Sequence, residues 1–310
     1  MAEKGTGFCS TKRVTAPLLY ILTHLHYNHK GGLNDMTGWM ILICLAVLGA
    51  ALVFFIAPGR RNEAQRAPFM RRTFAHRGLY SEDQRVPENS LPAFRAAVEA
   101  GYGVELDVQL TRDKQVVVFH DDTLKRACGT EARIDAFSYA ELTERMRLFG
   151  TEQTIPLFSE VLAVLDGRVP VIVELKSGGD RFGLCERTLA LLRLYAGPFC
   201  IESFDPYIVR WFYQNAPDIL RGQLSEQMRH SRSVLGLWKS FLMSRLFSNF
   251  AARAQFIAYR VGPKPWTVRL CERMGAMRVV WTARPSDSEA ALETAYDAII
   301  FEHYRPGSRY

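Results

Sequence analysis

Short apolar runs alternate with helical patterns along the chain from residue 73 onward. Runs of roughly four to eight mostly β-branched or aromatic residues predict strands. We expect strands at residues 73–76, 104–108, 116–119, 169–175, 200–204, 220–224, 256–261, 279–282 and 298–302. Amphipathic spacing predicts helices at residues 90–100, 158–165, 184–195, 206–215, 267–274 and 288–295. Alternation on this scale predicts an α/β fold with a parallel sheet.

Two parallel architectures compete, the doubly wound sheet and the (β/α)8 barrel. No G-x-G-x-x-G motif follows a predicted strand, so the dinucleotide-binding form of the open sheet loses support. The strand count exceeds eight by one. The stretch ELDVQLTRDKQVVVFHDD explains the excess, because the segment between its two apolar runs is too short for a helical crossover. We therefore predict a distorted (β/α)8 TIM-type barrel at residues 73–307, with a β-hairpin after strand 2.

The predicted hairpin also carries a spatial expectation. Folding about Asp113 and Lys114 pairs Asp107 with a residue at about His120. The hairpin would then bring His120 back to the level at which Glu105 and Asp107 leave the barrel. Residues 122–155 follow the hairpin as a small insertion.

An uncharged apolar segment runs from Trp39 to Ala57. Its length matches the roughly 20 residues that cross a bilayer. We interpret residues 37–57 as one retained transmembrane helix. A cleaved signal peptide and a buried core helix are the alternatives, but the apolar run is long for a signal and no A-x-A site follows it.

Arginines dominate the linker at residues 58–72, where Glu63 is the sole acid. The positive-inside rule then predicts a single-pass protein of the cell membrane with a cytoplasmic catalytic domain. Lysines and an arginine before the helix weaken that orientation. Residues 1–35 are an extension without clear structure, and translation from Met36 would remove its basic residues and favour the same orientation more strongly.

Composition narrows the partners and the compartment. The chain has 310 residues and a formal net charge of +7, which favours anionic partners. It carries no zinc-finger spacing and no RNP-like motif, so we expect no nucleic acid. The six cysteines are scattered without a C-x-x-C pair, which is typical of a reduced compartment.

Acidic residues mark the ends of two predicted strands. Glu105 and Asp107 stand two residues apart and so face the same way, and Glu174 and Lys176 repeat that spacing on VIVELKS. Three converging carboxylates repel one another unless a cation lies between them. Such an oxygen set suits Ca²⁺ or Mg²⁺ rather than Zn²⁺. A buried ionic network of these acids with Lys176 and Arg77 is the alternative.

Two histidines stand at predicted strand ends beside these acids. His76 and His120 are suited to proton transfer near neutral pH. Arg77 offers a planar fork for phosphate oxygens, and Lys176 offers a point charge. Asn89 follows Pro87 and Glu88 and is expected to hold the first loop through hydrogen bonds; a plain turn residue is the alternative.

A spaced set of motifs gives these residues a family context. HRG, PENSLPAF, ELDVQLTRDKQVVVFHDDTLKR, IPLFSEVL and VELK follow in order, with weaker echoes in ESFDP, which contains Ser203, and VVWTAR, which contains Trp281. Together they resemble the glycerophosphodiester phosphodiesterase family over residues 74–306.

The resemblance implies a distorted barrel, one divalent cation, and hydrolysis of glycerophosphodiesters to glycerol 3-phosphate and an alcohol. It implies that His76 and His120 serve as acid and base and that Glu105, Asp107 and Glu174 bind the metal. Two positions depart from the family pattern. The last strand ends in FEHYRP rather than a T-D-x-P-like sequence, and Arg284 stands where the family often has asparagine. Both lie near the alcohol or glycerol pocket in such barrels, so they bear on substrate preference.

A second feature concerns lipid. Residues 228–253 form a basic stretch whose apolar residues follow helical spacing, longer than the usual barrel helix. It is either a helix packed on the sheet or a membrane-surface helix that tilts the barrel mouth toward lipid. In the second case a lysolipid is a possible substrate and the activity is lysophospholipase D-like. A non-catalytic membrane-anchored barrel is the remaining alternative.

Overall fold

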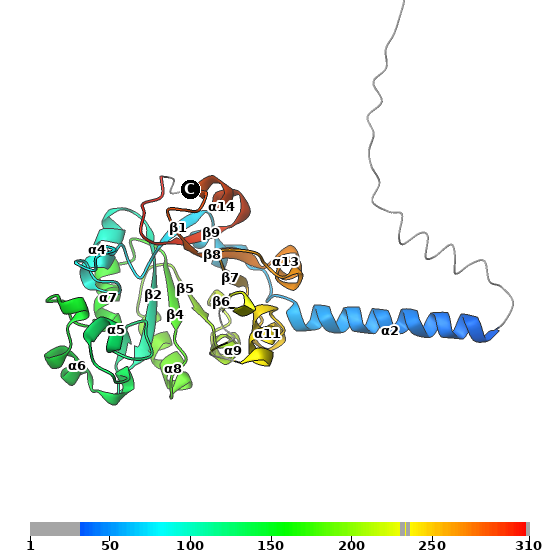
Figure 1. Cartoon of the computed structure of the whole chain (residues 1–310), viewed down its shortest axis with the longest axis horizontal. Helices are drawn as coiled ribbons and strands as arrows, with labels where there is room; N and C mark the ends of the chain where they lie inside the picture. Colours follow the sequence, from blue (N-terminus) through cyan, green and yellow to red (C-terminus); the bar gives the residue numbers. More distant parts are fainter. Residues whose placement is uncertain (1–31, 230–232, 234–235, 308–310) are drawn as a thin grey trace, which may run out of the picture. The chain divides into compact units, whose positions relative to one another are not determined.

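The computed structural model describes residues 32–229, 233 and 236–307 (Figure 1). Of the extension expected at residues 1–35, residues 1–31 lie outside this part, and residues 32–35 are helical, which corrects the expectation of no clear structure there. The described residues belong to two compact units, one ending at Val53 and the other beginning at Phe54. Helix α2 (Gly32–Ile56), most of which belongs to the first unit, contains the stretch Met36–Ile56, which is long and apolar enough to cross a membrane.

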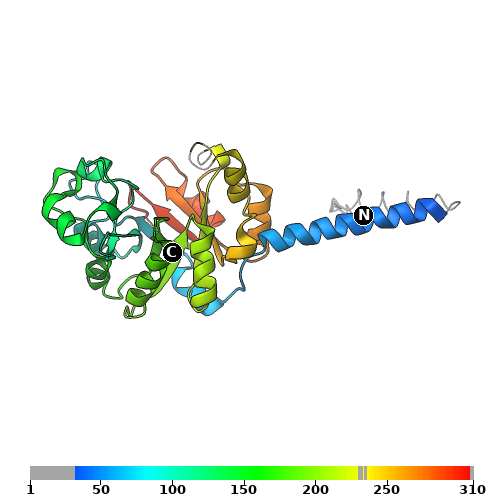
Figure 2. The same ribbon diagram turned by 90° about the horizontal axis from the view of Figure 1, so that it is seen from below.

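The second unit is a closed barrel of eight parallel strands. Strand β1 pairs with both β2 and β9, so the sheet closes on itself. The strands are β1 (Arg72–His76), β2 (Gly103–Leu110), β4 (Val171–Leu175), β5 (Phe199–Ser203), β6 (Arg221–Ser225), β7 (Phe256–Arg260), β8 (Met277–Ala283) and β9 (Ala298–Phe301). Figures 1 and 2 show helices around the outside of this sheet. The predicted TIM-type barrel is confirmed.

The outer helices begin and end within one residue of the expected bounds, except α8, which begins and ends three residues before the expected 184–195. They are α4 (Leu91–Glu99), α7 (Phe158–Leu165), α8 (Arg181–Leu192), α9 (Pro206–Asn215), α13 (Trp266–Arg273) and α14 (Glu289–Ala295). Ser90 caps α4 by accepting a hydrogen bond from the Ala93 amide, and Pro92 lies in the first turn. Gly101 follows the helix with φ of +77°, a conformation that favours glycine.

Along each strand, side chains point alternately toward the outer helices and into the barrel interior. In β2, Val104, Leu106 and Val108 pack in the cluster between sheet and helices, while Glu105 and Asp107 face the opposite way, into the barrel. Towards the amino-terminal ends of the strands the interior is apolar and contains Phe74, Ile172, Phe256 and Ile300. Gly103 lies opposite Phe74, and a Cβ there would come within 2.5 Å of the Phe74 ring. The barrel interior is therefore apolar at one end and acidic at the other.

The hairpin forms as expected, with a small change of register. Strand β3 (Val116–Val118) runs antiparallel to β2 and pairs Val118 with Val108. The Phe119 amide donates to the Asp107 carbonyl at 3.0 Å, so Phe119 rather than His120 lies opposite Asp107. Lys114 takes φ of +63° in the turn and sets this register. His120 follows directly and still reaches the acidic end.

The insertion at residues 122–155 has a small core of its own. It contains α5 (Lys125–Cys128) and α6 (Tyr139–Arg145), with single turns at Ile134–Ala136 and Leu148–Gly150. Its buried side chains include Leu124, Ile134, Leu142 and Ile155, which pack on the hairpin residue Val117. The insertion is thus fixed to the strand that leads to His120.

The basic stretch at residues 228–253 was expected to be one long helix. In the part that the structure describes, this expectation is wrong. Helix α11 (Leu237–Ser244) and helix α12 (Asn249–Ala252) are separate, and residues 230–232 and 234–235 lie outside the described part. Between the helices, Leu246 takes φ of +61° and its side chain is fully buried beside Val209 and Ile257. Burial of this one leucine overrides the helical spacing.

Candidate active site

Three buried carboxylates converge inside the barrel. Glu105 and Asp107 lie on β2, and Glu174 lies on β4, where it pairs in register with Asp107. One oxygen from each lies within 4.8 Å of the others. The three residues are buried, with exposed fractions of 2%, 0% and 7%. The convergence that the sequence predicted is therefore present.

The electrostatics of this triad are unbalanced. Burial, then Asp107 and the further carboxylate Glu202 of β5, raise the pKa of Glu105 well above its ordinary value. Burial also acts to raise the pKa of Asp107, but Lys176, His120 and Arg77 outweigh it and lower that pKa. Burial likewise raises the pKa of Glu174. Glu105 and Glu174 therefore resist ionisation beside the ionised Asp107, and a bound cation would favour the ionised form of all three.

The chemistry of the donor set fits a hard divalent cation. All three donors are carboxylates, the ligands that Ca²⁺ and Mg²⁺ prefer. The Asp107 Oδ1 atom is buried and accepts no hydrogen bond from any described residue. A buried acceptor without a donor is costly, so this oxygen is suited to a metal bond. Glu105, Asp107 and Glu174 can therefore hold one ion.

Two cations flank the acids. Lys176 Nζ lies 2.8 Å from Glu174 Oε1 and 3.4 Å from Asp107 Oδ1. Arg77 Nε lies 3.5 Å from Asp107 Oδ2, and the Arg77 amide donates to Glu105 at 3.1 Å. The ionic network considered as an alternative is thus also present. Both can hold for one site, because phosphate binding needs fixed cations beside the metal.

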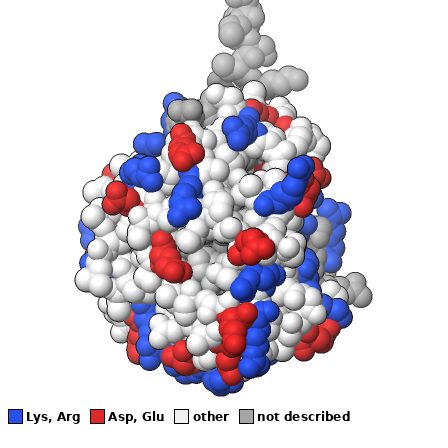
Figure 3. Space-filling view, turned by 90° about the vertical axis from the view of Figure 1, so that its left-hand side faces the viewer, with Lys and Arg blue, Asp and Glu red and all other residues white. Residues whose placement is uncertain are grey.

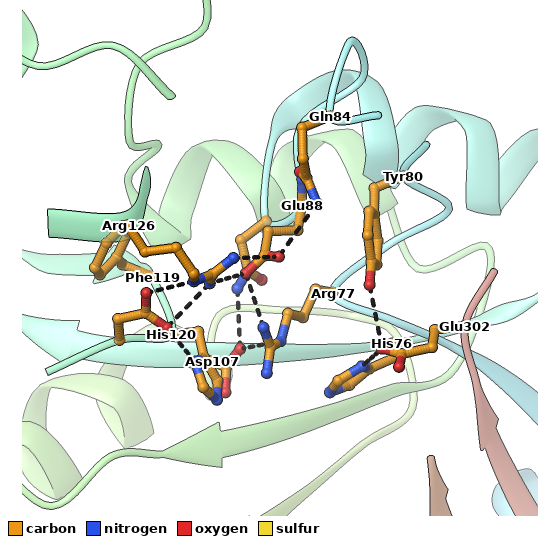
Figure 4. A network of polar contacts seen from close by, with 12 residues as sticks. His76, Arg77, Tyr80, Gln84, Glu88, Asp107, Phe119, His120, Arg126 and Glu302 are labelled. Carbon is orange, nitrogen blue, oxygen red and sulfur yellow. Dashed lines mark hydrogen bonds and ion pairs between the residues drawn. The ribbon is translucent and has the colours of Figure 1, made fainter. Parts of the chain in front are cut away.

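The loop after β1 is fixed to the triad. Asn89 Nδ2 donates to Asp107 Oδ2 at 2.9 Å, and Asn89 has a left-handed backbone with φ of +54°. Glu88 accepts from Arg77 at 2.8 Å and from Arg126 of α5 at 2.6 Å. Asn89 thus contacts Asp107 directly. Glu88 lies between Arg77 and Arg126 and positions Arg77 (Figure 4).

Each histidine presents the same nitrogen to a carboxylate. His76 Nδ1 lies 2.7 Å from Glu302 Oε2, and His120 Nδ1 lies 2.7 Å from Asp121 Oδ1. Burial would raise the pKa of both carboxyls, but their histidine and arginine partners lower both pKa values. Ionised carboxylates only accept, so each Nδ1 must donate. Each Nε2 then carries the lone pair when the ring is neutral.

The two rings approach the acidic end from different segments. Figure 4 shows His76 and His120 on either side of Arg77. His76 Nε2 lies 3.9 Å from Glu105 Oε2, and burial followed by the Arg77 charge lowers the pKa of His76. A cavity of about 660 Å³ opens beside His120 and Lys176, which gives a substrate access to this end.

The two departures from the family pattern meet in space. Arg284, from the end of β8, donates through Nε to Glu302 Oε1 at 2.8 Å. Tyr80 donates to the other oxygen, Oε2, at 3.1 Å. Glu302 is 7% exposed and is held by three side chains, one of which is His76. Arg284 and Glu302, which lie at the two departures from the family pattern, thus contact each other, and Glu302 also contacts His76.

Ser203 and Trp281 make contacts outside the acidic cluster. Ser203 Oγ donates to the Leu175 carbonyl at 2.7 Å and links β5 to β4. Trp281 Nε1 donates to the Ala258 carbonyl at 3.1 Å, and its ring packs edge to face on Phe204. Their pocket roles stay predictions.

Sequence reasoning missed four side chains of this network: Glu302, Asp121, Arg126 and Glu202. A signal was present for three of them. Glu302 ends the last predicted strand, which closure of the barrel brings beside β1. Asp121 directly follows His120, and Glu202 repeats on β5 the inward register of Glu174. Arg126 reaches the site only through the fold of the insertion.

Comparisons with known proteins agree on one family. Residues 76–304 match the glycerophosphoryl diester phosphodiesterase family. A glycerophosphodiester phosphodiesterase from Caldanaerobacter subterraneus is 30% identical, over 73% of this chain and 91% of that protein. A lysophospholipase D from Homo sapiens is 32% identical, over 43% of this chain but only 46% of that protein.

Solved structures show the same fold. A phosphodiesterase from Oleispira antarctica, in complex with the product sn-glycerol-3-phosphate, matches with a TM-score of 0.59. It is 24% identical and covers 75% of this chain and 93% of its own. A glycerophosphodiester phosphodiesterase from Thermotoga maritima has a TM-score of 0.54 and the same identity, over 74% of this chain and 93% of its own.

Proposed function

The chain belongs to the glycerophosphoryl diester phosphodiesterase family, and from that premise we propose how its site hydrolyses glycerophosphodiesters to glycerol 3-phosphate and an alcohol. The protein is a phosphodiesterase with an acidic site that could bind a metal. The proposal concerns the roles of single residues, the cation and the relation to a membrane. The observation that carries it is the meeting of two histidines, two cations and three acids at one end of the barrel.

Arg77 and Lys176 bind the phosphate in this proposal. Both are held in place by acids, Arg77 by Glu88 and Lys176 by Glu174, so neither needs to reorganise during the reaction. Burial would lower the pKa of Lys176, but Glu174 and Asp107 raise it, so this amine stays charged. Fixed cations of this kind stabilise charge on the phosphoryl oxygens more in the transition state than in the ground state.

Glu105, Asp107 and Glu174 would hold one divalent cation, Ca²⁺ or Mg²⁺. When bound, the ion supplies Lewis-acid stabilisation of phosphoryl charge, worth several kcal/mol. Lys176 contacts two of the three acids and restrains them when the ion leaves. Asn89 orients Asp107 so that its second oxygen, Oδ1, is the one left without a hydrogen-bond donor.

His76 and His120 move the protons. One Nε2 accepts a proton from the nucleophile, a glycerol hydroxyl or a water, and the other, protonated, donates to the leaving alcohol. Attack by water gives glycerol 3-phosphate directly. Attack by the hydroxyl gives a cyclic phosphate, which a water then opens: the histidine left neutral takes the proton of that water, and the histidine left protonated returns a proton to the hydroxyl. The carboxylates behind them, Glu302 and Asp121, fix each ring and stabilise its protonated form. One such group typically contributes about 10²–10⁴ in rate.

Hydrolysis of sn-glycero-3-phosphocholine tests these roles. His76→Ala and His120→Ala should each lower kcat by at least about 10² while circular dichroism stays unchanged. EDTA should abolish turnover, and added Mg²⁺ or Ca²⁺ should restore it. Near-normal turnover by either variant, or in EDTA, contradicts the proposed chemistry.

A lysolipid is the second candidate substrate. The human relative named above is a lysophospholipase D, although this chain aligns with less than half of it. Parallel assays with glycerophosphocholine and lysophosphatidylcholine separate the two activities. Faster turnover of lysophosphatidylcholine would identify the enzyme as a lysophospholipase D.

The membrane relation is also a proposal. Helix α2 is apolar enough to span a bilayer, and Arg60, Arg61, Arg71 and Arg72 follow it, which favours a single-pass protein with a cytoplasmic barrel. Trp238 and Leu242 on α11 are 75% and 46% exposed, a composition that suits a lipid surface. Acidic vesicles should bind residues 73–310 if α11 contacts lipid, provided this fragment is first shown to fold.

A further inference from the structure

A cavity of about 670 Å³ lies at the end of the barrel away from the catalytic residues. Arg221 is the first residue of β6, and Gln255 directly precedes β7, so the cavity lies at the amino-terminal ends of these parallel strands. The triad and His76 lie at the carboxyl ends. The cavity is therefore separate from the site described above, although both belong to the same compact unit.

Arg221 is a buried cation without an acidic partner in the described part of the chain. Arg221 is 4% exposed, and its Nε atom makes no hydrogen bond. The Tyr213 ring lies 4.8 Å from its guanidinium carbon and stabilises the charge. Burial lowers the pKa of Arg221 to about 10. An ionised group held away from water without a counter-charge is rare and costly, and it points to a missing anion.

The surroundings of Arg221 are also basic. Arg60, Arg61 and Arg253 line the same cavity. Arg61 pairs with Glu63, whereas Arg253 donates to the carbonyls of Phe54 and Ala57 and so keeps its charge uncompensated. By contrast, the face in Figure 3 shows acidic and basic side chains intermixed. The cavity thus concentrates positive charge that the face in that view does not.

The linker backbone approaches this charge closely at Gly59. Gly59 lies over the cavity, and a Cβ there would come within 3.2 Å of an Arg221 terminal nitrogen and 2.2 Å of the Arg253 carbonyl oxygen. Only glycine permits this close approach of the loop. The linker is thereby held against the guanidinium groups, which offer the forked donors that suit phosphate.

Helix α12, which ends just before Arg253, contacts the last residues of the apolar helix α2. Asn249 Nδ2 donates to the carbonyls of Ile56 and Ala57, and the Phe250 ring packs edge to face on Phe55 at 5.2 Å. Phe55 and Ile56 are the last residues of the stretch that could span a bilayer. Basic residues directly beyond such a stretch lie at the depth of lipid phosphates.

We propose that this cavity binds a phosphate-bearing anion through Arg221, with Arg60, Arg61 and Arg253 around it, and that phospholipid headgroups supply the anion. The choice of lipid as the source rests on the membrane anchoring proposed above; the anion site itself does not. Free phosphate offers the same oxygens and is the other source to be distinguished.

Two binding measurements on the full-length chain test this site, both in neutral detergent with EDTA and in the Lys176→Met background, so that neither a cation nor Lys176 binds phosphate at the catalytic end. Calorimetry measures inorganic phosphate, and native mass spectrometry counts retained phosphatidylglycerol. Arg221→Met should weaken each binding at least tenfold. Arg145→Gln, which removes an exposed arginine elsewhere, should leave both unchanged.

The outcomes separate the claims. Loss of both bindings, or of phosphatidylglycerol alone, in Arg221→Met supports a headgroup site. Loss of phosphate binding alone supports the anion site and refutes lipid as its source. Equal binding by wild type and Arg221→Met overturns the proposal.

A turnover control and a second variant separate loss of this site from loss of the fold or of catalysis. Turnover of sn-glycero-3-phosphocholine by Arg221→Met should stay within twofold of wild type, because the cavity is at the opposite end of the barrel. If that variant does not fold, the double variant R60Q/R61Q, which changes the solvent side of the cavity, should weaken both bindings at least threefold, and unchanged binding contradicts the site. Absent turnover in the wild type with intact anion binding would count against the proposed catalysis alone.

Discussion

Glu302 is the residue whose replacement tests the account of His76 most sharply. Its Oε2 accepts from His76 Nδ1 at 2.7 Å, while Arg284 holds its Oε1 at 2.8 Å. Glu302→Gln keeps the size and removes the charge. The amide oxygen can still accept a hydrogen bond from Nδ1, but it no longer stabilises a protonated ring or enforces one orientation.

The expected loss follows from the type of contact. A hydrogen bond to a charged group contributes about 1.5–3 kcal/mol. If that contribution is made in the transition state, kcat falls about 10- to 150-fold at 1.36 kcal/mol per factor of ten. KM should change little, because Glu302 stands behind the ring rather than at the phosphate. The fall should be smaller than for His76→Ala.

Steady-state hydrolysis of sn-glycero-3-phosphocholine at saturating Mg²⁺ measures both constants. Glu144→Gln is the matched control, because Glu144 is exposed on the insertion and its one ion-pair distance is 4.0 Å. In the background of His76→Ala, Glu302→Gln should cause no further loss, since residues that act as a unit are not additive. Wild-type kcat in Glu302→Gln, or a full additional loss in the double variant, refutes the positioning role.

Three further changes test separate parts of the structure. Burial would raise the pKa of Asp121, but His120 and Arg126 lower it below its ordinary 3.8. Its stabilising contribution is therefore complete above pH 3.8 and lost as the pH falls further, so the Tm deficit of Asp121→Asn should shrink between pH 6 and pH 3, and a constant deficit counts against it. Lys176→Met should lower kcat/KM by about 10²–10³ without weakening Mg²⁺ binding, because Lys176 neutralises the same acids; calorimetry showing lost Mg²⁺ affinity argues otherwise. Gly78→Ala should destabilise the fold by about 1–3 kcal/mol in urea, since φ is +81° and the new Cβ would lie 2.9 Å from Ala93; an unchanged midpoint disproves the strain.

The barrel and the triad were predictable because both depend on local alternation. Apolar residues on one strand face and acids on the other place Glu105, Asp107 and Glu174 inside, whatever the details of the loops. The hairpin could be predicted only to within one residue, since the backbone of Lys114 sets the register and its conformation is not written in the apolar pattern.

Contacts between distant segments could not be predicted in the same way. The pairing of Arg284 with Glu302 behind His76 requires the side-chain geometry of three strands at the closure of the barrel. The separation of α11 from α12 reflects the burial of Leu246, which outweighs helical spacing in the local sequence. Long-range packing decided both.

Anomalous diffraction from crystals of the enzyme soaked in Mn²⁺ tests the central claim most directly. The account predicts one strong peak inside the carboxyl end of the barrel, within about 2.6 Å of an oxygen from each of Glu105, Asp107 and Glu174, with both histidines facing it. A fully ordered barrel with no peak there, or with its peak at another place, would contradict the claim.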